Sequence, residues 1–188
     1  MAGIGFELKK LFNTRSAAGY MKAYGYSAVI TAGPFALMTG MVLAIQMLFR
    51  YFGVSYVDSQ LYTASIIYPF VFSNIISSGF LMVITRYLAD LLYGSDYRDV
   101  TASLYGVIAI TEGIGAIAAL VFFWNKPLDF LTKFLTYIFY MQMLAVWLQG
   151  IYLTAVKNYK GLFFSYMIGV CTTIVLTFFV LATGCIEP

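Results

Sequence analysis

Five long stretches of this sequence are almost free of charged side chains, and they constrain the fold more than any other feature. They cover residues 28–49, 62–85, 103–124, 134–156 and 161–183. The third contains Glu112, and the others contain no Asp, Glu, Lys or Arg. A bilayer core about 30 Å thick is spanned by about 20 apolar residues in a helix that rises about 1.5 Å per residue. Each stretch is therefore long enough to cross a membrane.

The composition excludes a water-soluble domain. Hydrophobic residues make up 62% of the chain and charged residues 10%, whereas soluble domains have about 45–50% and about 25%. In lipid, helices satisfy their own backbone hydrogen bonds, so each span must be helical. We expect an all-α, polytopic transmembrane helix bundle over residues 25–188, preceded by a cytoplasmic interfacial segment over residues 1–24.

The distribution of basic residues predicts the orientation. Eight of them flank one side of the predicted spans: Lys9, Lys10, Arg15, Lys22, Arg86, Arg98, Lys157 and Lys160. Three flank the other: Arg50, Lys126 and Lys133. Because basic residues are enriched in cytoplasmic connections, the amino terminus is expected in the cytoplasm. Residues 4–15 place apolar side chains on one helical face, which favours a helix lying in the membrane interface.

Glu112 is the residue in the predicted spans most able to carry chemistry. A carboxylate in the middle of a span costs about 2.5 kcal/mol or more, so it should face protein or water. It is either a protonatable or cation-coupled group in a transport path, or a group that only cross-links helices. Helical spacing puts one group of residues on its face: Tyr105, Ala109, Gly115, Ala116 and Ala119. It puts a second group opposite, towards lipid: Val107, Ile110, Ile114, Ile117 and Val121.

Uncharged polar residues form stripes on two other spans. Asn74 lies among Ser73, Ser77 and Ser78 in the second, and Gln142 and Gln149 share one face of the fourth. These groups either hydrogen-bond neighbouring helices, which is the commoner case, or line a hydrated path for a hydroxyl-rich substrate.

Proline interrupts two of the predicted spans. Gly33 and Pro34 lie in the first and Pro69 in the second. Proline removes a backbone donor, so both helices are expected to kink or unwind there, and Pro34 is the better candidate for a moving part. Broken helices often mark transporter binding sites, although a static kink held by packing is the alternative.

The sequence lacks the residues and motifs on which several kinds of enzyme and metal site depend. The chain has no histidine, no phosphate-binding GxxxxGK[ST] loop, no GxSxG and no HExxH. We therefore expect no enzymatic activity, no cofactor and no metal site. The basic residues form no continuous stripe, which argues against a nucleic-acid partner.

The opening residues resemble a known family. MAGIGFELKKL at residues 1–11, AYGY at residues 23–26 and TAGP at residues 31–34 are similar to the amino-terminal region of PelG, a membrane component of Pel exopolysaccharide export. The resemblance implies the multidrug/oligosaccharidyl-lipid/polysaccharide exporter superfamily, whose members have about twelve helices in two bundles around a cavity. Twelve spans of about 20 residues exceed this chain's length, so we expect most of one bundle from a truncated chain.

The resemblance also implies a function and partners. The expected function is export of a Pel-like exopolysaccharide across the bacterial inner membrane, in biofilm formation, with Glu112, Asn74, Gln142 and Gln149 along the polymer's path. Membrane lipid, the polysaccharide, other Pel inner-membrane proteins and a cytoplasmic glycosyltransferase are the expected partners. The alternative is a noncatalytic scaffold that anchors the glycosyltransferase.

Overall fold

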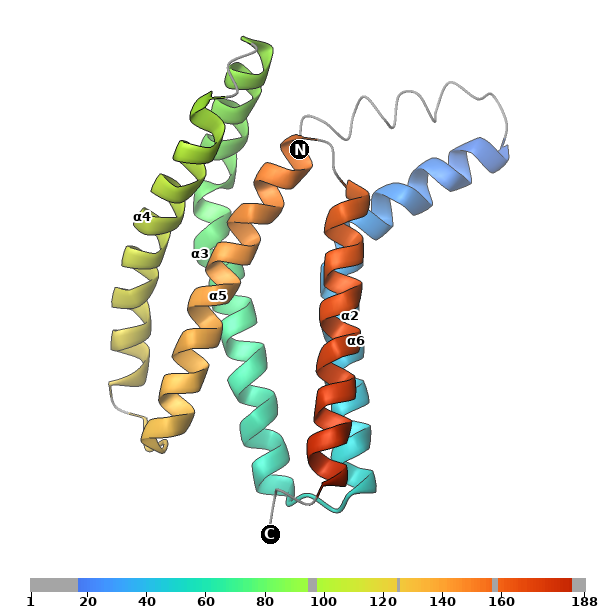
Figure 1. Ribbon diagram of the computed structural model, residues 1–188, viewed down its shortest axis with the longest axis vertical. Helices are drawn as coiled ribbons and strands as arrows, with labels where there is room; N and C mark the ends of the chain where they lie inside the picture. Colours follow the sequence, from blue (N-terminus) through green and yellow to red (C-terminus); the bar gives the residue numbers. More distant parts are fainter. Residues whose placement is uncertain (1–16, 95–97, 125, 157–158, 184–188) are drawn as a thin grey trace. The chain divides into compact units, whose positions relative to one another are not determined.

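The computed structural model describes residues 17–94, 98–124, 126–156 and 159–183. Within these ranges, α-helices are the only regular secondary structure (Figure 1). They are α2 (Ala17–Tyr51), α3 (Tyr56–Tyr93), α4 (Arg98–Phe123), α5 (Phe130–Ala155) and α6 (Tyr159–Ala182). All five contain a segment long and apolar enough to cross a membrane. The expected all-α membrane fold is confirmed, while the predicted interfacial helix at residues 4–15 lies outside the described residues.

Helix α3 extends well past the predicted second span. Its 38 residues correspond to about 57 Å at about 1.5 Å per residue, which exceeds the bilayer core of about 30 Å. The expected span ends at residue 85, but the helix continues to Tyr93. Most of the connection expected between the second and third spans is therefore helical.

The chain divides into two compact units. Among the described residues, unit 1 contains residues 64–156 and unit 2 contains residues 17–63 and 159–183. Helix α3 begins in unit 2 and continues into unit 1.

In unit 1, α4 and α5 pack through small residues on one helix and large residues on the other. A side chain is buried at every fourth position of α5 from Thr136 to Tyr152, and these positions form one helical face. Opposite Leu144 and Tyr140, α4 presents the buried Gly115. A Cβ atom on Gly115 would overlap Leu144 Cδ1 and lie 3.3 Å from Tyr140 Oη. Glycine therefore permits the close approach of α4 and α5 at this point.

A second apolar cluster joins three helices of unit 1. Ile84 and Leu88 from α3 are buried together with Leu148 and Tyr152 from α5, and Leu104 of α4 packs against them. The Tyr152 hydroxyl forms a hydrogen bond with Ser103 Oγ of α4, at 3.0 Å. Apolar contact and a hydrogen bond together hold the helices here.

Unit 2 is built on packing between α2 and α6. Met41, Ile45 and Phe49 are buried at four-residue intervals along α2, so they share one face. The Phe49 ring meets the edge of the Tyr62 ring, with centroids 5.1 Å apart. The Phe52 ring of the α2–α3 connection contacts Phe178 of α6 at 5.8 Å.

A glycine ends α2. Gly53 has a φ of +72°, and its N–H donates to the Arg50 carbonyl at 3.4 Å. The Val54 N–H donates to the Phe49 carbonyl at 3.0 Å. This is a Schellman motif, in which the left-handed residue satisfies carbonyls at the helix end.

Both predicted helix breaks lie inside continuous α-helix. Pro34 is within α2 and Pro69 within α3. Figure 1 shows that α2 is bent, with its blue first part at an angle to the part that follows. Gly33 and Pro69 are buried and Pro34 is half-buried. A role for these residues in motion stays a prediction.

Candidate functional site

Glu112 lies on α4 beside the face that packs against α5. It is half-buried and follows the fully buried Thr111. Within the described part of the chain, its carboxylate makes no hydrogen bond or ion pair. The carboxylate thus stands in a membrane-spanning helix without a protein partner in this chain's described residues.

The packing face of α4 differs in part from the predicted one. Gly115 and Ala119 are buried, as expected, and four residues predicted to face lipid are exposed: Ile110, Ile114, Ile117 and Val121. Tyr105 and Ala109 were expected on the packing face but are exposed, and Val107 packs against the Leu148 cluster instead. The reason is that the buried face is centred on Thr111, Gly115 and Ala119, which rotates it away from Glu112.

Thr111 is a polar residue that the sequence reasoning missed. Its exposed fraction is 0%, and its hydroxyl has no hydrogen-bond partner among the described residues. Several other threonines in these helices donate to the carbonyl four residues earlier; Thr39, for example, donates to Phe35 at 2.9 Å. A buried hydroxyl without a partner costs about 1–3 kcal/mol. Two adjacent residues of α4, Thr111 and Glu112, therefore lack polar partners among the described residues.

The serines of α3 support the helix-linking interpretation. The Trp147 indole N–H of α5 donates to Ser73 Oγ at 3.1 Å, and Ser73 donates to the Phe70 carbonyl at 2.9 Å. Ser77 donates to the Ser73 carbonyl at 2.7 Å. Asn74, beside this pair, is half-buried and forms no hydrogen bond in the described chain. The sequence did not predict the hydrogen bond of Trp147, because a tryptophan in an apolar span is equally consistent with packing alone.

The two glutamines of α5 lie away from Glu112. Gln142 and Gln149 are exposed, and at about 100° per residue they lie nearly opposite Leu144. Leu144 is the residue of α5 that meets Gly115 of α4. The structure therefore separates the four predicted path residues into a half-buried pair, Glu112 and Asn74, and an exposed pair on the far face of α5.

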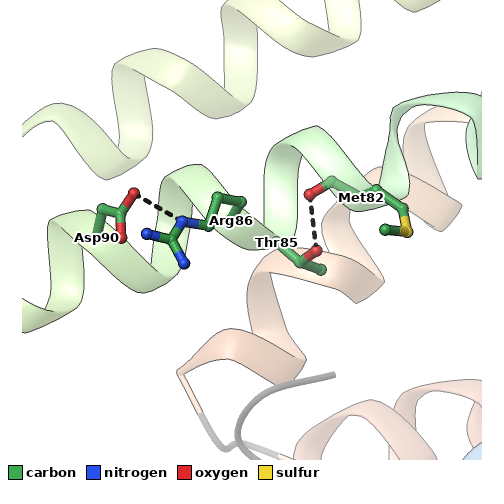
Figure 2. Close-up of polar contacts among 4 residues, drawn as sticks. All are labelled: Met82, Thr85, Arg86 and Asp90. Atoms are coloured by element: carbon green, nitrogen blue, oxygen red, sulfur yellow. Dashed lines mark hydrogen bonds and ion pairs between the residues drawn. The ribbon is translucent and has the colours of Figure 1, made fainter.

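The extension of α3 carries an ion pair at its surface. Figure 2 shows Arg86 Nε 3.2 Å from Asp90 Oδ2, one turn later, as the four-residue spacing predicts. The side chains are 80% and 62% exposed. In the same view, the Thr85 hydroxyl donates to the Met82 carbonyl at 3.1 Å. Within the described residues, no group of three or more His, Cys, Asp or Glu side chains could hold a metal ion.

Comparison with known protein families shows to which family the chain belongs. The sequence profile of the family described as "PelG: Putative exopolysaccharide Exporter (EPS-E)" matches residues 1–187. The chain belongs to the PelG family. Comparison with curated proteins and with solved structures gave no match.

Family and fold together establish the general role of the chain. PelG is a family of exopolysaccharide export, and the five apolar helices are those of a multi-pass membrane protein. The resemblance noted in the first residues is confirmed over nearly the whole sequence. Lipid is the expected solvent for the exposed apolar faces.

Proposed function

We propose that this PelG-family chain forms part of the membrane path through which an exopolysaccharide is exported, rather than a passive anchor. The observation that supports this most is the half-buried Glu112 in α4, which has no polar partner in the part of the chain that the structure describes. An ionisable residue inside a membrane is costly, and it is most often kept for function. A residue that only cross-linked helices would have a partner, as Ser73 has in Trp147.

Asn74 extends the polar surface in unit 1. It is half-buried on α3, next to the Ser73–Trp147 hydrogen bond. Gln142 and Gln149 would meet water or a further helix on the exposed face of α5, since amides are poorly placed against lipid. In the proposed path, Glu112 supplies a charge or a proton, and the amides bind sugar hydroxyls.

We place the protein in the bacterial inner membrane with its amino terminus in the cytoplasm. The excess of basic residues on one side of the spans supports this orientation. The bend in α2 and the prolines Pro34 and Pro69 are candidate hinges for movement during export. Other Pel inner-membrane proteins and a cytoplasmic glycosyltransferase are the proposed partners.

One observation favours the scaffold as a second candidate function. The extension of α3 past residue 85 exposes a charged and aromatic surface at Arg86, Tyr87, Asp90 and Tyr93. Such a surface could dock a cytoplasmic enzyme. Under this proposal, changes there impair polymer production more than changes at Glu112 do.

The test is Glu112→Gln in the full-length protein, in cells that make the polymer. We expect secreted polymer to fall about tenfold, the factor that corresponds to about 1.4 kcal/mol in a barrier, and polymer to accumulate inside the cells. Membrane level is measured by immunoblot, and intracellular and secreted polymer are measured together.

Asp99→Asn is the matched control. It makes the same change from carboxylate to amide at an exposed residue in the first turn of α4. Secretion should stay normal in this variant. Normal secretion in Glu112→Gln at normal membrane level would remove Glu112 from the path, and loss of synthesis in variants of the α3 extension would favour the scaffold.

A further inference from the structure

Unit 1 carries a patch of aromatic rings that packing of its core does not require. Tyr68 and Phe72 on α3 meet Phe122 on α4, and we call these three residues the aromatic shelf. The ring centroids of Tyr68 and Phe122 are 6.2 Å apart, those of Phe72 and Phe122 5.4 Å, and those of Tyr68 and Phe72 6.4 Å. Three rings from two helices thus form one continuous surface.

The shelf is open and has a cation at its edge. Tyr68, Phe72 and Phe122 are 54%, 41% and 36% exposed. Lys126 Nζ lies 5.4 Å from the centroid of the Phe122 ring, within the range of a cation–π interaction. Lys126 is itself exposed, so its ammonium can donate to a ligand on the shelf.

The exposed surface of α4 between residues 110 and 121 has different chemistry. Ile110, Ile114, Ile117 and Val121 are aliphatic and 47–75% exposed, as suits a face towards lipid tails. In the described part of α4, aromatic rings in contact with one another lie where the helix approaches its end at Phe123. By the proposed orientation, this end lies on the side of the membrane to which the polymer is exported.

We propose that the aromatic shelf is a binding site for sugar rings of the exported polysaccharide. The C–H bonds on one face of a pyranose carry partial positive charge, and they stack on the electron-rich face of an aromatic ring. The Tyr68 hydroxyl and the Lys126 ammonium supply polar groups for sugar hydroxyls at the margin. This inference rests on the proposed export function and deepens it, because it names the contact that receives the polymer near its exit.

The test measures sugar binding directly. The probe is a set of fluorescently labelled oligosaccharides, prepared by partial hydrolysis of the polymer that the cells secrete. Binding to the full-length protein in lipid nanodiscs is followed by anisotropy. Phe122→Leu and Tyr68→Leu should each weaken binding about three- to tenfold, the range expected from ring-stacking energies. Tyr68→Phe keeps the ring and should retain most of the affinity.

Phe130→Leu is the matched control. Phe130 is 80% exposed and stacks on Phe134 of the same helix, with centroids 6.3 Å apart. If these rings only anchor the protein in the headgroup layer, Phe130→Leu and Phe122→Leu should have equal effects on sugar binding. The proposal predicts unchanged sugar binding in Phe130→Leu.

The two proposals fail in different ways. If the shelf variants bind the oligosaccharides as the unaltered protein does, while Glu112→Gln still blocks secretion, the shelf is wrong and the export path stands. If the shelf variants lose binding but Glu112→Gln secretes normally, the sugar site stands and the role of Glu112 is wrong. Tryptophan fluorescence of the same samples measures the amount of folded protein, so weaker binding caused by misfolding is recognised. The shelf proposal is wrong if Tyr68→Phe loses as much sugar affinity as Tyr68→Leu.

Discussion

Substitution of Gly115 by alanine should loosen the packing of α4 against α5. The added Cβ would overlap Leu144 Cδ1, and Leu144 has no exposed surface into which it could move. Tyr140 Oη, 3.3 Å from the same position, closes a second direction. Forcing a methyl group into a packed interface costs about 1–3 kcal/mol.

Gly113→Ala isolates this steric effect. Gly113 lies two residues away on α4, and a Cβ there would have no neighbour within 4 Å. Both substitutions share the gain of about 1 kcal/mol from replacing glycine within a helix. The difference between the two variants is therefore the overlap alone, and we expect Gly115→Ala to be less stable than Gly113→Ala by about 1–3 kcal/mol.

The assay is unfolding of the full-length protein by SDS titration from mild detergent, followed by tryptophan fluorescence. A second substitution sharpens it, because Leu144→Ala removes the atom that Gly115→Ala meets. Leu144→Ala alone should lower the free energy of unfolding by about 2–5 kcal/mol. In the variant that carries both substitutions, the methyl group added by Gly115→Ala enters the space that the Leu144 side chain has left. We expect a favourable coupling energy of about 0.5–3 kcal/mol. Equal stability of Gly115→Ala and Gly113→Ala, with no coupling to Leu144→Ala, would refute the close packing described here.

Other substitutions test single features by the same unfolding measurement. Trp147→Phe removes the donor to Ser73 and should cost about 1 kcal/mol, here followed by circular dichroism because the substitution removes a tryptophan; the loss should not add to that of Ser73→Ala if the bond is real. Gly53→Ala places a side chain at a φ of +72° and should destabilise by about 1 kcal/mol, so an unchanged midpoint would argue against the left-handed cap. Arg86→Ala breaks an exposed ion pair with Asp90 and should change stability by less than about 0.5 kcal/mol, and a larger loss would mean that Arg86 has another partner.

The sequence predicted the membrane-spanning helices of the described residues because a chain in lipid must satisfy its own backbone hydrogen bonds. A long uncharged stretch must be a helix in a bilayer, and the five stretches found in the sequence all lie mainly within α2 to α6. The length of α3 was less predictable. Charged residues such as Arg86 and Asp90 end an apolar stretch in the sequence, but outside the membrane they are compatible with a helix that continues.

The sequence was less informative about which residues meet across helices. Spacing predicted a packing face of α4 that is correct at Gly115 and Ala119 but wrong at Tyr105, because small residues lie on several sides of that helix. The contacts with Leu144 and Tyr140 show that Gly115 is a point of close approach. The indole of Trp147 forms a hydrogen bond with Ser73, whereas the hydroxyl of Thr111 is buried without a hydrogen-bond partner among the described residues. No periodicity distinguishes these cases, because a hydrogen bond depends on the register between two helices.

Some polar residues of unit 1 have a hydrogen-bond partner in the described chain and others do not, and the proposed function gives the two groups different roles. Ser73 and Trp147 bond to each other across two helices, so their loss should lower stability and reduce export only as far as folded protein is lost. Glu112 has no partner among the described residues, so its neutralisation removes a charge from a membrane helix and should leave stability unchanged or increase it. A fall in export without a fall in stability is therefore expected of Glu112→Gln and not of Trp147→Phe. A protein that only anchored an enzyme would give no such separation, because its intramembrane polar residues would act through stability alone.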